Sequence, residues 1–99
     1  MRKGTTPTLI FTLPFASELI ATAKVTFCQL EKVKLEKHTK DFTMKDNTLS
    51  LKLTQAETFL FNCNENIRLQ LRVVTTSGEA LATDVYTVFV SECLDGEVI

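Results

Sequence analysis

The chain has 99 residues, 44% of them hydrophobic, which suits one domain (residues 1–99) with one core. Its formal net charge of −1 gives no reason to expect a nucleic-acid partner, and no stretch approaches the roughly 20 apolar residues of a membrane span. Cys28, Cys63 and Cys93 lack metal-type spacing, and the first residues lack a signal-peptide pattern. We therefore expect free, mostly buried thiols in a protein made in a reducing cytoplasm.

Short alternating runs dominate the first half of the chain and predict strands at 5–13, 23–30, 42–44 and 49–53. Pro7 suits an edge strand or the beginning of a strand, and Pro14 ends the first strand. Residues 32–37 alternate as well, and they either continue the second strand or form a third. Residues 17–20 form one helical turn capped by Ser17, or otherwise a loop. Residues 45–47 have turn composition.

The segment Thr54-Gln55-Ala56-Glu57 has the Ser/Thr-x-x-Glu pattern of a capping box. It predicts a single helical turn in which the Thr54 hydroxyl accepts from the backbone N–H of Glu57 and the carboxylate reaches back. This turn would bring Phe59 and Phe61 onto the core.

Residues 66–90 are predicted to form a long β-hairpin. Its first arm, 67–73, alternates without a break, and its second arm, 80–90, is rich in Val, Thr, Tyr and Phe. A three-residue loop ending on Gly78 is expected, because that loop length needs a residue in the left-handed region. The predicted opposed pairs are Val73 with Leu81, Leu71 with Thr83, Leu69 with Val85, and Ile67 with Thr87. Arg68 and Arg72 on the outer face would then pair with Asp84 and Tyr86.

The far end of the second arm is apolar on both faces, and the chain ends on two further apolar residues. One face of that arm should therefore contact another segment or another chain. The candidate interface consists of Thr87, Val88, Phe89, Val90, Val98 and Ile99.

Six to eight short strands with one helical turn predict an all-β fold, an antiparallel β-sandwich. The helical turn between two strands matches the connection that crosses between the sheets of an immunoglobulin-like domain. We therefore expect an immunoglobulin-like sandwich.

Residues that could support catalysis or metal binding are scattered. His38, the only histidine, lies in a polar turn, and no cysteine is paired with it locally. The acidic residues of the last segment lack the spacing of a cation loop, and no glycine-rich phosphate loop is present. The basic run Lys32, Lys34, Lys37 and Lys40 is best explained as a charged edge strand that blocks unwanted pairing, with contact to an anionic partner as the alternative. We expect no catalytic, cofactor or metal site, no small-molecule substrate, and no membrane or nucleic-acid partner.

Several stretches together resemble known phage proteins. They are RKGTTPTLIFTLPF (2–15), AKVTF (23–27), LTQAETFLF (53–61), LQLRV (69–73) and SGEA (77–80). The first two resemble the opening of small phage and prophage proteins from Gram-positive bacteria. The order of all of them is similar to the N-terminal β-sandwich domain of phage baseplate upper proteins.

This resemblance implies a phage or prophage structural or assembly protein of the tail or baseplate type. Such a protein is not an enzyme. It would be made in the cytoplasm of the bacterial host, incorporated into the virion, and joined to other phage structural proteins or to itself as a homo-oligomer. The alternatives are a small prophage accessory or regulatory protein that binds a host protein and, from a third class, a thiol-based enzyme.

Overall fold

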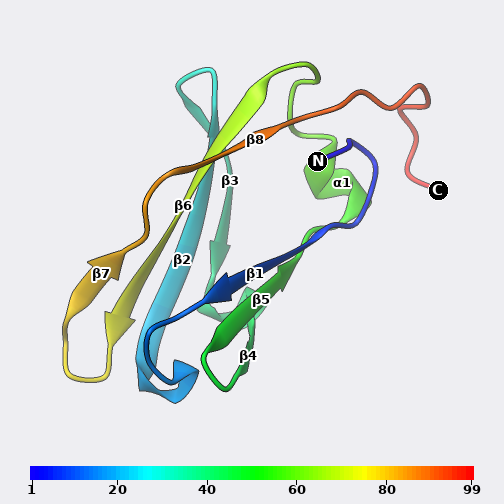
Figure 1. Ribbon diagram of the computed structural model, residues 1–99. Helices are drawn as coiled ribbons and strands as arrows, with labels where there is room; N and C mark the ends of the chain where they lie inside the picture. The colour runs from blue at the N-terminus through cyan, green and yellow to red at the C-terminus, as the bar shows by residue number, and fades with distance from the viewer.

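A computed structural model describes residues 1–99, which form two antiparallel sheets packed face to face (Figure 1). The smaller sheet has the order β1 (Thr8–Thr12), β5 (Thr48–Lys52), β4 (Thr43–Lys45). The larger sheet has the order β3 (Lys32–His38), β2 (Ile20–Gln29), β6 (Asn66–Thr75), and both β7 (Ala80–Ala82) and β8 (Tyr86–Phe89) pair with the outer side of β6. The helical segments are η1 (Ser17–Leu19), η2 (Thr39–Asp41) and α1 (Gln55–Thr58).

This strand order is that of an immunoglobulin-like sandwich. If β1 takes the place of strand B, the smaller sheet contains strands B, E and D, and the larger sheet contains C′, C, F and G. α1 lies in the connection from β5 to β6, where the chain crosses from one sheet to the other. The predicted fold class is confirmed, with eight strands and with three short helical segments instead of one. No strand occupies the place of strand A beside β1.

One core of sixteen buried apolar residues fills the space between the sheets. Alternate residues of the central strands supply most of it: Ala23, Val25 and Phe27 from β2, Leu49 and Leu51 from β5, and Ile67, Leu69, Leu71 and Val73 from β6. Burial of each valine, leucine, isoleucine or phenylalanine in this set stabilises the fold by roughly 1.5–3 kcal/mol, before the loss of chain entropy is counted. The inward faces are those that the alternation predicted.

The capping box forms as expected. The backbone N–H of Glu57 donates to Thr54 Oγ1 over 3.1 Å, and the backbone N–H of Thr54 donates to Glu57 Oε1 over 2.8 Å. Phe61 is fully buried in the core, whereas Phe59 is only half-buried. Phe59 packs against Gly4, where an added Cβ would lie 2.7 Å from the Phe59 ring.

The 66–90 hairpin is confirmed near its loop and differs further along. Gly78 has a φ of +86°, and Val73 lies opposite Leu81, both as predicted. Beyond Thr83 the second arm contains one additional residue, so Ile67 lies opposite Val88 and not opposite Thr87. The predicted register is therefore wrong in β8. The extra residue turns Val88 and the following valine, Val90, toward the core, and apolar burial favours that arrangement.

Two local expectations were resolved by the structure. Residues 32–38 are a separate strand, which a tight turn through Leu30 and Glu31 joins to β2. Both turn residues have positive φ, 51° and 64°. Residues 17–19 do form a helical turn, but Ser17 does not cap it: Ala16 occupies the N-cap position and no side chain bonds there.

Candidate protein-contact surfaces

The residues with nucleophilic or metal-binding side chains are dispersed over the fold. His38 is exposed at the end of β3, Cys28 lies on β2, Cys63 follows α1, and Cys93 lies near the C-terminus. No group of three histidine, cysteine, aspartate or glutamate side chains is placed to hold a metal ion. The three thiols are free, but the expectation that they are mostly buried is wrong: two are half-buried and Cys93 is exposed.

The lysine-rich strand β3 forms one edge of the larger sheet, as the charged-edge interpretation predicted. One of its lysines, Lys37, turns inward and forms an ion pair with Glu57 at the end of α1. Both side chains of this pair are largely shielded, with 16% and 18% of their surface exposed. Lys37 therefore ties the edge strand to the helical turn.

The outer face of the hairpin differs from expectation. Arg72 lies opposite Ala82, as the predicted register has it, but Arg68 lies opposite Thr87 of β8. Neither arginine forms an ion pair. The extra residue places Thr87 and not Tyr86 opposite Arg68, so the predicted pairing is wrong there. The register opposite Arg72 is unchanged, and no ion pair with Asp84 forms.

The six predicted interface residues fall into three groups. Val90 is fully buried in the core of this chain, and Val88 is half-buried against that core. Val90 therefore has no surface left for a partner in this fold, and its assignment to an interface is wrong. Val88 also lines an open groove between β8 and β1, and its assignment stays a prediction. Thr87 and Phe89 face outward on β8, and 52% of Phe89 is exposed. Val98 and Ile99 are exposed as well, at 59% and 94%.

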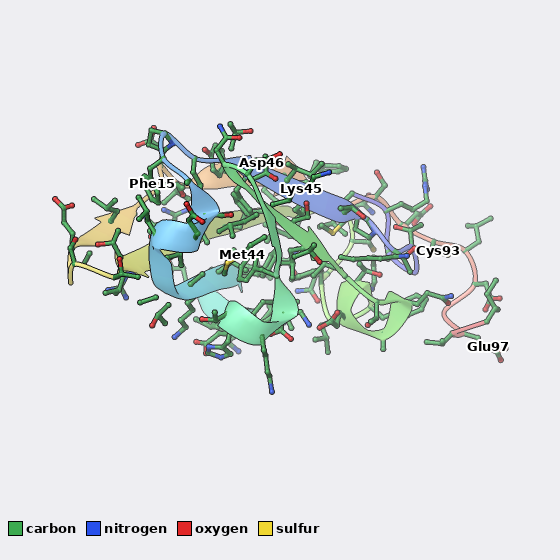
Figure 2. The ribbon with its side chains drawn as sticks, turned by 90° about the horizontal axis from the view of Figure 1, so that it is seen from below. Phe15, Met44, Lys45, Asp46, Cys93 and Glu97 are labelled. Carbon is green, nitrogen blue, oxygen red and sulfur yellow. The ribbon has the colours of Figure 1, made fainter.

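The tail segment, residues 91–99, lies at the same end of the molecule as α1 (Figure 1). Figure 2 shows its residues Cys93 and Glu97 at one end of the molecule and Phe15 toward the other. The Gln55 side chain holds the last residue by two hydrogen bonds, 2.9 Å from the Ile99 N–H to Oε1 and 3.1 Å from Nε2 to the Ile99 oxygen. The Leu94 side chain is 97% exposed. The tail segment thus has a fixed end and apolar side chains directed to solvent.

The other end of the sequence is anchored nearby. Thr58 of α1 is fully buried, and its Oγ1 accepts from the backbone N–H of Gly4 over 2.9 Å. The N-terminal segment also runs parallel to the chain after β8, where the Ser91 N–H donates to the Met1 oxygen over 2.7 Å. Both ends of the chain therefore pack around α1.

An open apolar groove separates β1 from β7 and β8, and sequence reasoning did not find it. Its larger part, about 580 Å³, lies between β1 and β8 and is lined by residues that include Leu9, Leu69, Tyr86 and Val88. A smaller part of about 320 Å³ continues past Phe15 toward β7. The one signal in the sequence was Pro7, which suggested an edge strand. Only the folded structure shows that the edge at β1 and the edge at β7 and β8 lie on either side of one groove.

Neither a protein-family model nor a curated protein matches the sequence. Among solved structures, the chain is similar to the V domain of amphioxus IgVJ-C2, with 10% sequence identity and a TM-score of 0.36, over 91% of this chain and 96% of that chain. No helix in the structure has the length and apolar character needed to cross a membrane.

Proposed function

We propose that this chain is a non-enzymatic assembly module of a phage or prophage, of the tail or baseplate type, which acts through protein–protein contacts. The resemblance of residues 2–15, 23–27 and 53–61 to small phage proteins supports this class. An immunoglobulin-like sandwich is also a common scaffold for binding, although the same fold hosts many functions.

The observation that carries the proposal is the exposure of apolar side chains around the tail segment. Leu94 and Ile99 are almost fully exposed, and about half of Phe89 is exposed on the neighbouring strand. Single exposed apolar residues are common, but several large ones on one terminal segment are typical of surfaces that become covered by a partner. We propose that a further phage structural protein covers this segment.

The test is mass spectrometry of particles purified from the strain that carries the gene. The chain should co-purify with the particles in a constant ratio to the other structural proteins. A protein that is missing from particles but copurifies with a host protein would overturn the structural role and favour the regulatory alternative.

A pair of variants tests whether the tail segment, and not another part of the surface, makes the proposed contact. Leu94→Ser together with Ile99→Ser should reduce incorporation into particles at least several-fold, because both side chains are removed from the proposed contact. Leu60→Ser is the matched control, since Leu60 is also about half exposed, at 49%, but lies outside the tail segment. Equal incorporation of both variants would contradict the assignment of the contact.

A further inference from the structure

A sandwich of two open sheets has four edges, and three of them here are protected against pairing with another chain. β3 carries several lysines, and β4 has only three residues and ends on Lys45. The β7–β8 edge is interrupted by the extra residue after Thr83, and the chain's own N-terminus occupies its far end, where the Met1 ammonium donates to the Phe89 oxygen over 2.8 Å. Lysines, short length, irregularity and coverage are the usual means by which edges are blocked.

β1, the fourth edge, has none of these features. Its sequence Thr-Leu-Ile-Phe-Thr contains no charge and no proline, and its pairing with β5 continues through all five residues without a shift. Ile10, at its centre, is 65% exposed. An uncharged, regular and apolar edge of this kind is a template for a further strand.

The backbone groups available on this edge follow from the hydrogen bonds at both ends of β1. The Leu53 N–H donates to the Pro7 oxygen over 3.0 Å, and the Leu13 N–H donates to the Asn47 oxygen over 2.7 Å. Because hydrogen-bonded pairs alternate along an antiparallel ladder, the odd-numbered residues of β1 bond to β5. The N–H and C=O groups of Thr8, Ile10 and Thr12 therefore point away from β5, toward the open edge.

We propose that β1 pairs antiparallel with β1 of a second copy of this chain, across a two-fold axis at Ile10. Thr8 would lie opposite the partner's Thr12, and Ile10 opposite the partner's Ile10. This register joins the available groups of all three residues on each side in hydrogen-bonded pairs. The two smaller sheets would become one continuous sheet in the order β4-β5-β1-β1-β5-β4.

Charge identifies a second copy as a suitable occupant. Pairing β3 with itself would bring lysines of two copies together, whereas β1 contains no ionisable side chain that its copy could repel. The segment is also symmetric in polarity about Ile10, so antiparallel self-pairing places threonine beside threonine and isoleucine beside isoleucine. On the inner face, Leu9 would lie beside the partner's Phe11, next to the 580 Å³ groove that now separates β1 from β8.

The pairing deepens the proposed function, since it names a second copy as one partner of an assembly module. The two claims are nevertheless tested separately. A strictly monomeric protein that is present in purified particles would overturn the pairing and leave the assembly role standing. A dimeric protein that is absent from particles would overturn the assembly role and leave the pairing standing.

The first test compares the mass in solution of three forms of the full chain by sedimentation velocity up to high micromolar concentration. The unmodified protein should reach twice its 11.1 kDa mass. Ile10→Lys should remain a monomer, because it would place two like charges opposite each other at the axis. Val33→Lys is the matched control on β3, at 57% exposure, and should still dimerise.

The second test uses the symmetry of the proposed contact. Ile10→Lys and Ile10→Glu should each be monomeric alone, and a mixture of the two should recover the dimer, because residue 10 meets residue 10 only across this axis. Circular dichroism of each variant verifies that it is folded, which is expected since Ile10 is exposed. A monomeric unmodified protein, a dimeric Ile10→Lys variant, or a mixture of folded variants that stays monomeric would each overturn the proposal.

Discussion

The Glu57 carboxylate makes two contacts, one within its own helical turn and one to the edge strand β3. One oxygen accepts from the Thr54 N–H and completes the capping box, and the other pairs with Lys37 on the edge strand β3. Partial burial raises the pKa of Glu57, but the hydrogen bonds from Lys37 and Thr54 and the positive charge of Lys37 together hold this pKa below its ordinary value. A lowered pKa means that the folded state favours the ionised carboxylate, and therefore that this group links stability to pH.

Replacing Glu57 with glutamine should isolate the ionic part of this contact, since glutamine can still close a capping box. The carboxylate stabilises the fold above its unfolded pKa of about 4.3, and this contribution disappears as the pH falls through the lower folded pKa. Glu57→Gln should therefore cost about 0.5–1 kcal/mol at pH 7 and much less at pH 3. Urea unfolding of the variant and the natural protein at pH 7 and pH 3 measures this difference in the free energy of unfolding.

The matched control for this prediction is Glu36→Gln, which removes a more exposed pair with Lys24 at 3.5 Å. It should change stability little at either pH, since an exposed ion pair is screened by solvent. A cost for Glu57→Gln that is unchanged at pH 3 would show that packing, and not charge, is the basis of the contact.

The turn between β2 and β3 illustrates how an element can be held by its surroundings against local preference. Leu30 and Glu31 both lie in the left-handed region, which is strained for residues with a Cβ and which two-residue hairpins usually fill with Asn-Gly. The pairing of β2 with β3 and with β6 fixes this turn from both sides. This strain also explains why the sequence alone left the third strand undecided, since no glycine or asparagine marks the turn.

Changing Leu30→Asn together with Glu31→Gly should stabilise the protein by about 1–2 kcal/mol, because both residues would then suit positive φ. Little packing is lost, since Leu30 is 56% exposed. Thermal unfolding gives the change in melting temperature. The control Glu79→Gly should be destabilising, because φ there is not positive and glycine only adds freedom to the unfolded chain. A double variant less stable than the natural protein would refute the strain argument.

At the scale of the whole molecule, the sandwich lacks a strand beside β1 and has a groove along that edge. The N-terminal residues turn at Gly4, which has a φ of +75° and is held by Thr58, and they run beside the chain after β8 and not beside β1. The chain therefore covers the end of β8 and leaves the edge of β1 open. This arrangement is the basis of the two-fold pairing proposed above.

The packing of β8 gives a further prediction about the whole fold. Val90→Lys should unfold the protein or cost more than about 4 kcal/mol, because it places an unpaired charge in the core. The adjacent Phe89→Lys faces solvent and should change stability by about 0.5 kcal/mol or less. Denaturant unfolding of the two variants measures the difference. Similar stabilities for both would mean that Val90 does not belong to the core.

Local patterns in the sequence determined the elements that depend only on neighbouring residues. The capping box at Thr54 and Glu57, the left-handed turn at Gly78 and the inward face of β6 all follow from short-range chemistry and alternation. They could be predicted because hydrogen bonds and side-chain direction within a few residues fix them. The sandwich itself followed from the number and spacing of such strands.

Only the tertiary structure decided the features that depend on partners distant in sequence. The extra residue after Thr83 reverses which of Val88, Phe89 and Val90 face the core, and this could not be read from a run that is apolar on both faces. Which strand forms an open edge depends on the order of strands in each sheet. The sequence alone therefore could not predict that Thr8, Ile10 and Thr12 lie on an open edge. Register and edge position are set by pairing between segments tens of residues apart, and no local pattern encodes them.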